Sequence, residues 1–67
     1  MNVFINNNSI NCSEETTLHQ LLHTQGITSS KGIAVAINNS VIPKADWEQK
    51  KLTNNDKITI IRATQGG

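Results

Sequence analysis

The sequence has few cysteine, proline and aromatic residues, the residue types on which many small proteins depend for stability or for a reactive site. Its 67 residues include one cysteine, one proline and two aromatic residues. The single cysteine, Cys12, excludes an intrachain disulfide, and no apolar run approaches the roughly 20 residues that span a bilayer. The opening MNVFI lacks the basic region and long apolar stretch of a signal peptide. We therefore expect a cytoplasmic protein without membrane association.

The net charge and the length of the chain further limit what kind of protein it can be. The net charge is +1, and the lysines and arginine are scattered along the chain. Because no basic stripe is present, nucleic-acid binding is not expected. A chain of this length forms one domain, residues 1–67, that buries only roughly 60% of its unfolded surface. Regular packing must therefore stabilise the fold.

The apolar pattern predicts several short strands and one helix. Asn-rich turns separate the strands, since asparagine tolerates left-handed backbone. The predicted strands are residues 3–5, 10–12, 32–38, 41–42 and 57–63. Residues 44–48 are expected to form a turn or short 3₁₀ segment that folds Trp47 onto the core.

The predicted helix covers about Thr17 to Gln25. Thr17 and Gln20 have the spacing of a capping box, and Gly26 is suited to a left-handed C-cap with Ile27 packing back on the last turn. One apolar stripe follows the cap: Leu18, Leu21 and Leu22. The order β-β-α-β-β-β predicts an α+β fold, a mixed four- to five-stranded sheet with the helix packed across it. We expect the last strand at the centre, beside the first.

The chain ends in Gln65-Gly66-Gly67 directly after the last predicted strand. Gly66 and Gly67 have no Cβ and can therefore enter a channel that is too narrow for other residues, and Gly67 carries the free carboxylate. The alternative is an ordinary frayed terminus.

Other candidate groups are better explained as structural or solvent-exposed. His19 and His23 have the i, i+4 spacing of two metal ligands, but no third ligand is evident. Cys12 has no basic neighbour in sequence to activate its thiol. We expect all five carboxylates to be solvated: Glu14, Glu15, Asp46, Glu48 and Asp56.

The segment NNSVIPKADW, residues 38–47, and the closing NNDKITIIRATQGG carry a family resemblance. Together with the element order, they resemble the ubiquitin-like sulfur carriers, most closely those that supply sulfur for the thiazole ring of thiamine. The Pro43-Lys44-x-x-Trp47 pattern points to the thiazole branch, whereas Gly66-Gly67 is common to the superfamily. The resemblance covers the whole chain and implies a β-grasp fold.

The resemblance also implies a function. An E1-like adenylyltransferase would use ATP to adenylate the Gly67 carboxylate. A sulfur donor, such as the persulfide of a cysteine desulfurase, would convert it to a thiocarboxylate, and thiazole synthase would receive the sulfur. The carrier itself would bind no cofactor or metal and would not be an enzyme.

Alternation along the strands suggests where partners dock. If Val3 and Ile5 face inward, Phe4 faces outward. If Ile58 and Ile60 face inward, Ile61 and Ala63 face outward. We expect Phe4, Ile61, Arg62 and Ala63 to contribute to a docking face. Three alternatives stay open: a carrier for molybdenum-cofactor or cysteine synthesis, a modifier ligated to lysines, and a domain with an idle tail.

Overall fold

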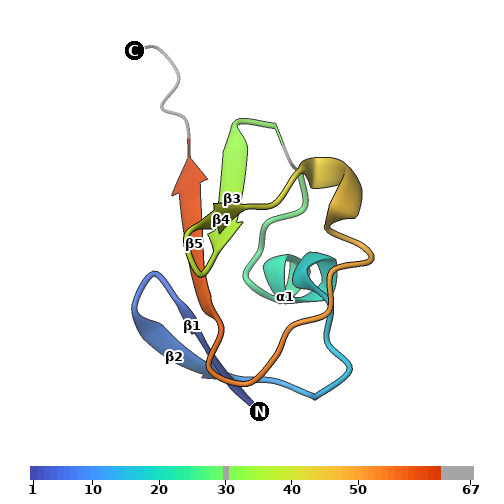
Figure 1. The fold of residues 1–67 in the computed structure, drawn as a ribbon. Coiled ribbons are helices and arrows are strands. Elements are labelled where there is room, and N and C mark those ends of the chain that lie inside the picture. The colour runs from blue at the N-terminus through green and yellow to red at the C-terminus, as the bar shows by residue number, and fades with distance from the viewer. Residues whose placement is uncertain (30, 63–67) are drawn as a thin grey trace.

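The computed structural model describes residues 1–29 and 31–62. The chain forms five strands, one α-helix and one 3₁₀ turn (Figure 1). In chain order these elements are β1 (Asn2–Ile5), β2 (Asn8–Asn11), α1 (Leu18–Thr24), β3 (Ile33–Ile37), β4 (Ser40–Val41), η1 (Lys44–Asp46) and β5 (Lys57–Arg62).

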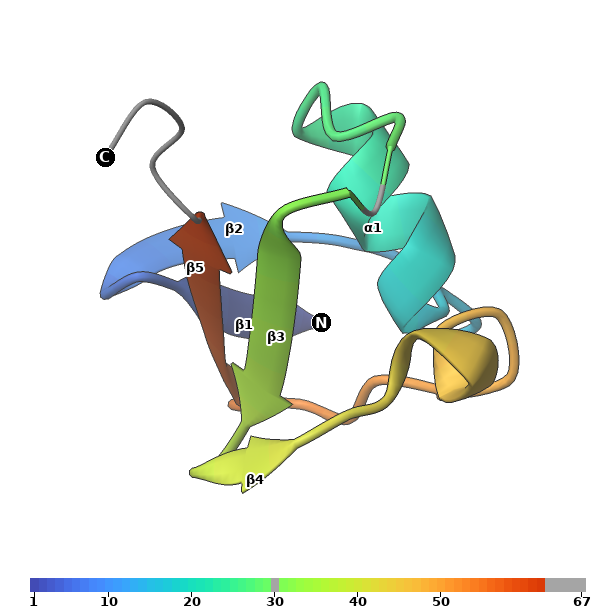
Figure 2. The same cartoon turned by 90° about the horizontal axis from the view of Figure 1, so that it is seen from above.

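All five strands belong to one sheet in the order β2-β1-β5-β3-β4. The β1–β5 pairing is parallel and the other pairings are antiparallel, so the sheet is mixed. Seen from above, α1 lies across one face and leaves the other uncovered (Figure 2). The structure therefore confirms the predicted sheet, with five strands, and the central position of β5 beside β1.

Both hairpins turn on two consecutive asparagines. Asn6 and Asn7 have φ angles of 48° and 73°, and Asn38 and Asn39 have 50° and 71°. Two positive φ values in a two-residue loop are typical of the type I′ turn, whose twist matches that of the flanking strands. Each turn is shorter than the sequence suggested. Consequently β2 begins at Asn8 and β4 at Ser40, one or two residues earlier than predicted.

The helix begins and ends as predicted. Thr17 Oγ1 accepts from the backbone N–H of Gln20 at 3.2 Å, and Gln20 Oε1 accepts from the Thr17 N–H at 3.1 Å. At the other end, Gly26 has a φ of +81°. Its N–H donates to the His23 carbonyl and the Ile27 N–H to the Leu22 carbonyl, both at 3.0 Å. This is the Schellman pattern of hydrogen bonds.

Helix length also bears on membranes. Over residues 1–29 and 31–62, no helix is long and apolar enough to cross a membrane.

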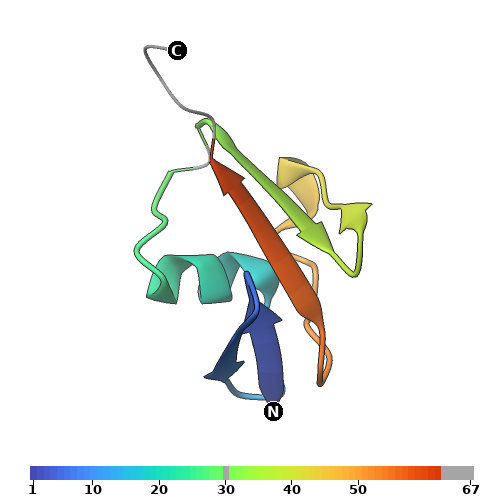
Figure 3. The ribbon, with the colours of Figure 1, turned by 90° about the vertical axis from the view of Figure 1, so that its left-hand side faces the viewer.

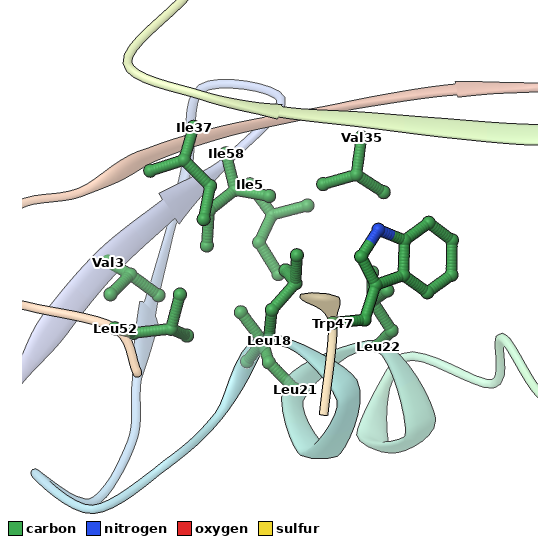
Figure 4. Close-up of a cluster of buried hydrophobic side chains, with 10 residues drawn as sticks. All are labelled: Val3, Ile5, Leu18, Leu21, Leu22, Val35, Ile37, Trp47, Leu52 and Ile58. Carbon is green, nitrogen blue, oxygen red and sulfur yellow. The ribbon is translucent and has the colours of Figure 1, made fainter. Parts of the chain in front are cut away.

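The core lies between α1 and the inner face of the sheet (Figure 4). Trp47 is buried, and its Nε1–H donates to the Ile42 carbonyl at 2.9 Å. The 3₁₀ turn after Pro43 therefore places the indole against the core, as predicted. The buried apolar side chains are Val3, Ile5, Leu18, Leu21, Leu22, Val35, Ile37, Trp47, Leu52 and Ile58.

The prediction that all five carboxylates are solvated is wrong for Asp56, which is only 7% exposed. Its Oδ1 accepts from Asn38 Nδ2 at 3.0 Å and from Thr53 Oγ1 at 2.8 Å. Its Oδ2 accepts from the Thr53 N–H at 2.8 Å. These bonds offset the loss of hydration and fix the turn that precedes β5. The other four carboxylate residues are exposed.

Candidate functional site

The C-terminal tail continues from the central strand. β5 ends at Arg62, and five residues follow it in the sequence. Three predicted site residues, Ala63, Gly66 and Gly67, lie outside the described residues. Five residues span at most roughly 17 Å when extended. A partner that acts on the Gly67 carboxylate must therefore come close to the sheet around Arg62.

Two asparagine side chains hold β5 from opposite sides. Asn38 Oδ1 accepts from the Lys57 N–H at 3.0 Å, and the Asn38 N–H donates to the Lys57 carbonyl at 2.8 Å. On the β1 side, Asn6 Oδ1 accepts from the Ile60 N–H at 2.9 Å, and Asn6 Nδ2 donates to the Ile60 carbonyl at 3.4 Å. Each hairpin turn thus bonds to the strand that carries the tail. Asn38 holds the first residue of β5, and Asn6 holds the strand at Ile60, two residues before it ends at Arg62.

The uncovered face of the sheet carries an apolar patch near the tail. Ile61 and Val41 are the large hydrophobic residues that the described chain leaves most exposed, at 57% and 73%. In the sheet register, Ile61 lies opposite Ala34, and Val41 lies opposite Ala36. These four residues, called here the Val41–Ile61 patch, lie on the face opposite α1, because their β3 neighbour Val35 points into the core. The two alanines make the centre of the patch shallow.

Of the patch residues, only Ile61 was expected from the sequence. The signal for Ala34 and Ala36 was present in residues 33–37, where these two alanines alternate with large residues. Large side chains on the buried face and alanines on the open face indicate a flat surface. The exposure of Val41 was not evident, since it depends on the position of β4 at the sheet edge.

Phe4 lies on the same face but apart from the patch. It is half-buried and lies opposite Lys57, four β5 positions before Ile61. That separation is about 13 Å along a strand. Phe4 instead lines a groove of about 520 Å³, with the Asn6–Asn7 and Asn38–Asn39 turns on its sides. The structure therefore does not bring Phe4 and Ile61 into one continuous patch.

Arg62 is exposed and lies opposite Ile33 in the register. Successive strand residues point to opposite faces, so Arg62 belongs to the face that carries α1, not to that of Ile61. Its guanidinium is therefore placed at the rim of the sheet beside the start of the tail.

The remaining candidates offer no reaction centre. His19 and His23 are exposed, with ring centroids 6.5 Å apart, and residues 1–29 and 31–62 contain no group of three metal-ligating side chains. Cys12 is half-buried. A second cavity, of about 330 Å³ between α1 and η1, includes His19, Lys44 and Glu48. It lies on the α1 side of the sheet, opposite the Val41–Ile61 patch.

The mixed five-stranded sheet with one helix across it is a β-grasp fold. A crystal structure of the thiamine biosynthesis protein ThiS from Geobacter metallireducens matches with a TM-score of 0.83 over 100% of both chains, at 17% identity. A solution structure of a thiamine biosynthesis protein from the same organism matches with a TM-score of 0.79, over 100% of this chain and 88% of the other. The expected β-grasp fold is thereby confirmed.

Sequence comparison identifies the family. The ThiS family model matches residues 3–67, and the chain belongs to that family. The sulfur carrier protein ThiS of Escherichia coli is 30% identical over 67 residues, which are the whole of both chains. The family match extends through Gly66 and Gly67.

Proposed function

We propose that this protein is a cytoplasmic sulfur carrier for the thiazole ring of thiamine, and that it acts as a co-substrate rather than a catalyst. The observation that carries this proposal is the end-to-end match to the sulfur carrier protein ThiS of Escherichia coli. The Pro43-Lys44-x-x-Trp47 pattern supports the thiazole branch, because it resembles the pattern of the thiazole-type carriers.

The working group is the Gly67 carboxylate. A carboxylate is ionised at neutral pH and is a poor electrophile. In the proposed reaction, an E1-like adenylyltransferase supplies ATP, a Gly67 oxygen attacks the α-phosphorus, and pyrophosphate leaves. A donor persulfide then attacks the carbonyl carbon and displaces AMP. The product is an acyl disulfide between the donor's cysteine and Gly67. A second thiol attacks the cysteine sulfur of this acyl disulfide and forms a disulfide with it, and the S–S bond to the carrier breaks, so that the thiocarboxylate leaves with the transferred sulfur and can go to thiazole synthase.

This chemistry assigns the carrier two tasks, delivery and docking. The Gly66-Gly67 pair has no Cβ and fits a narrow channel in the activating enzyme. The Val41–Ile61 patch lies on the open face, within reach of a partner at the tail, and exposed apolar surface of this kind is typical of protein interfaces. The carrier needs no bound metal or cofactor, since ATP binds to its partner.

Genetic rescue tests the proposal. We expect the chain to restore growth without thiamine in a bacterial strain that lacks its own thiazole sulfur carrier. Deletion of Gly66-Gly67 abolishes the rescue, while the urea midpoint of the purified protein stays unchanged. Adenylation of the chain without rescue indicates another sulfur pathway. Rescue by the deleted chain contradicts a role for the tail.

Alanine substitutions test the fit of the two glycines more finely. Gly66→Ala and Gly67→Ala each add one methyl group beyond the end of β5. We expect both variants to fold normally and to lose adenylation. Normal adenylation of both would refute the narrow-channel argument.

A further inference from the structure

The last part of β5 has a paired strand on one side only. Strand β1 pairs with β5 as far as Ile5 opposite Ile58, whereas β3 pairs with it as far as Ile33 opposite Arg62. Views along two directions show β3 and β5 continuing together past the end of the β1–β2 hairpin (Figure 1, Figure 3). The five-stranded sheet therefore narrows to two strands at this end.

This two-stranded extension, residues 33–35 of β3 and 60–62 of β5, is called here the β3–β5 ribbon. It carries Ala34 and Ile61 of the Val41–Ile61 patch, and the tail follows directly after Arg62. Two strands without further neighbours are only marginally stable in water. The position of Ile61 and Arg62 therefore depends on what holds the outer sides of the ribbon.

The outer sides of the ribbon are held by single residues. In the part of the chain that the structure describes, β4 pairs with β3 only at Ala36 and Ile37. One further bond on that side runs from the Ile42 N–H to the Val35 carbonyl at 2.9 Å. On the β5 side, the bonds come from Asn6.

Asn6 continues the β1 side of the ladder with its side chain. Its backbone N–H donates to the Ile58 carbonyl at 2.9 Å. Its Oδ1 accepts from the Ile60 N–H at 2.9 Å, and its Nδ2 donates to the Ile60 carbonyl at 3.4 Å. The carboxamide thus provides the acceptor and the donor that a further β1 residue would provide. Because Asn6 also turns the hairpin with a φ of 48°, glycine could replace it in the turn but not in these bonds.

We propose that Asn6 is a positioning residue for adenylation: by bonding both backbone groups of Ile60, it holds the β3–β5 ribbon in the orientation in which the adenylating enzyme docks. The proposal rests on the proposed function. Ile61 and Arg62 follow Ile60 directly and lie between it and the tail. Without the Asn6 amide, the ribbon has the docking orientation for a smaller part of the time, and the enzyme must select that population.

Asn38 provides a matched control at the other end of β5. Its φ of 50° is nearly that of Asn6, and its Oδ1 accepts from the Lys57 N–H at 3.0 Å. Its Nδ2 also donates to Asp56 Oδ1 at 3.0 Å. Removing the Asn38 amide should therefore lower the free energy of unfolding at least as much as removing that of Asn6, while the bonds to Ile60 remain.

Asn6→Gly and Asn38→Gly each remove one carboxamide and keep the turn, because glycine adopts a positive φ without strain. Amide hydrogen exchange at Ile61 and Thr59 is measured by NMR in both variants and in the unmodified chain. Both residues lie opposite alanines of β3, which neither substitution alters. The KM and kcat for the carrier are measured by carrier-dependent ATP–pyrophosphate exchange with the adenylating enzyme of the same organism. Urea unfolding gives the stability of each variant.

Two solvent-exposed hydrogen bonds, each at the lower end of the usual contribution, correspond to about fivefold in an equilibrium constant. We expect Asn6→Gly to speed hydrogen exchange at Ile61 and to raise the KM, each about fivefold. Its kcat should stay within about twofold, since the tail itself is unchanged. Asn38→Gly should speed hydrogen exchange at Thr59 more than at Ile61 and change the KM less than about twofold.

Two results would overturn the positioning role and leave sulfur carriage intact. One is an unchanged KM for Asn6→Gly, whether or not hydrogen exchange at Ile61 becomes faster. The other is an equal rise of the KM in both variants, which would assign the effect to stability alone. If the unmodified chain supports no ATP–pyrophosphate exchange, the proposed function fails and the positioning role fails with it.

Discussion

Replacing Ile61 with alanine separates docking from folding. Ile61 is 57% exposed and lies opposite Ala34 on the face away from α1. The substitution therefore removes apolar surface that the fold itself buries only in part. We expect the free energy of unfolding to change by less than about 1 kcal/mol, the range of strand propensities. Binding to the adenylating enzyme should change more.

The size of the docking loss follows from the exposed fraction. Isoleucine has three more carbons than alanine, each contributing about 0.8 kcal/mol when fully buried. Docking can bury at most the exposed 57% of the side chain. The loss is then about 1.4 kcal/mol, or roughly tenfold in the dissociation constant. Val41→Ala removes two carbons from a side chain 73% exposed, and the same reasoning gives roughly sevenfold.

Isothermal titration calorimetry with the adenylating enzyme measures both losses, and urea unfolding measures the stability of each variant. His23→Ala is the matched control, because His23 is exposed on α1, across the sheet from the patch. Its affinity should equal that of the unmodified chain. An unchanged dissociation constant for Ile61→Ala, with its fold intact, would refute docking through the Val41–Ile61 patch.

Three further predictions concern stability. Asp56→Ala leaves three hydrogen-bond donors without their acceptor, and urea unfolding should show a loss of about 3 kcal/mol; a loss below about 1 kcal/mol would mean that the turn forms without this carboxylate. Trp47→Phe removes the indole N–H and leaves the Ile42 carbonyl without its donor. Thermal melts should show that the free energy of unfolding falls by about 2 kcal/mol. An unchanged melting temperature would contradict this role for the indole. Gly26→Ala meets no atom within 4 Å of the new Cβ but keeps a φ of +81°, so conformational strain alone should lower stability by about 1 kcal/mol; a neutral urea midpoint would be the opposite result.

Local signals in the sequence predicted the local structure well. The Thr17–Gln20 spacing was sufficient for the capping box, and Gly26 for the C-cap, because both motifs are built from residues within a few positions of each other. The central position of β5 was also predicted, since its β-branched residues suit a strand with neighbours on both sides.

What the sequence did not reveal depends on register and on long-range partners. The burial of Asp56 needs Asn38, which lies 18 residues away and approaches only when β3 pairs with β5. The separation of Phe4 from Ile61 depends on which β5 residue lies opposite Phe4 in the parallel pairing. Neither is encoded by a local motif. The position of Arg62 on the opposite face from Ile61, by contrast, follows from strand alternation alone.

The most direct test of sulfur carriage is the intact mass of the purified chain after incubation with ATP, a sulfur source and lysate of its own organism. Sulfur carriage predicts the mass gain of one oxygen-to-sulfur exchange at Gly67, absent when Gly66-Gly67 is deleted. An unchanged mass, in a lysate that converts a known carrier, would contradict it.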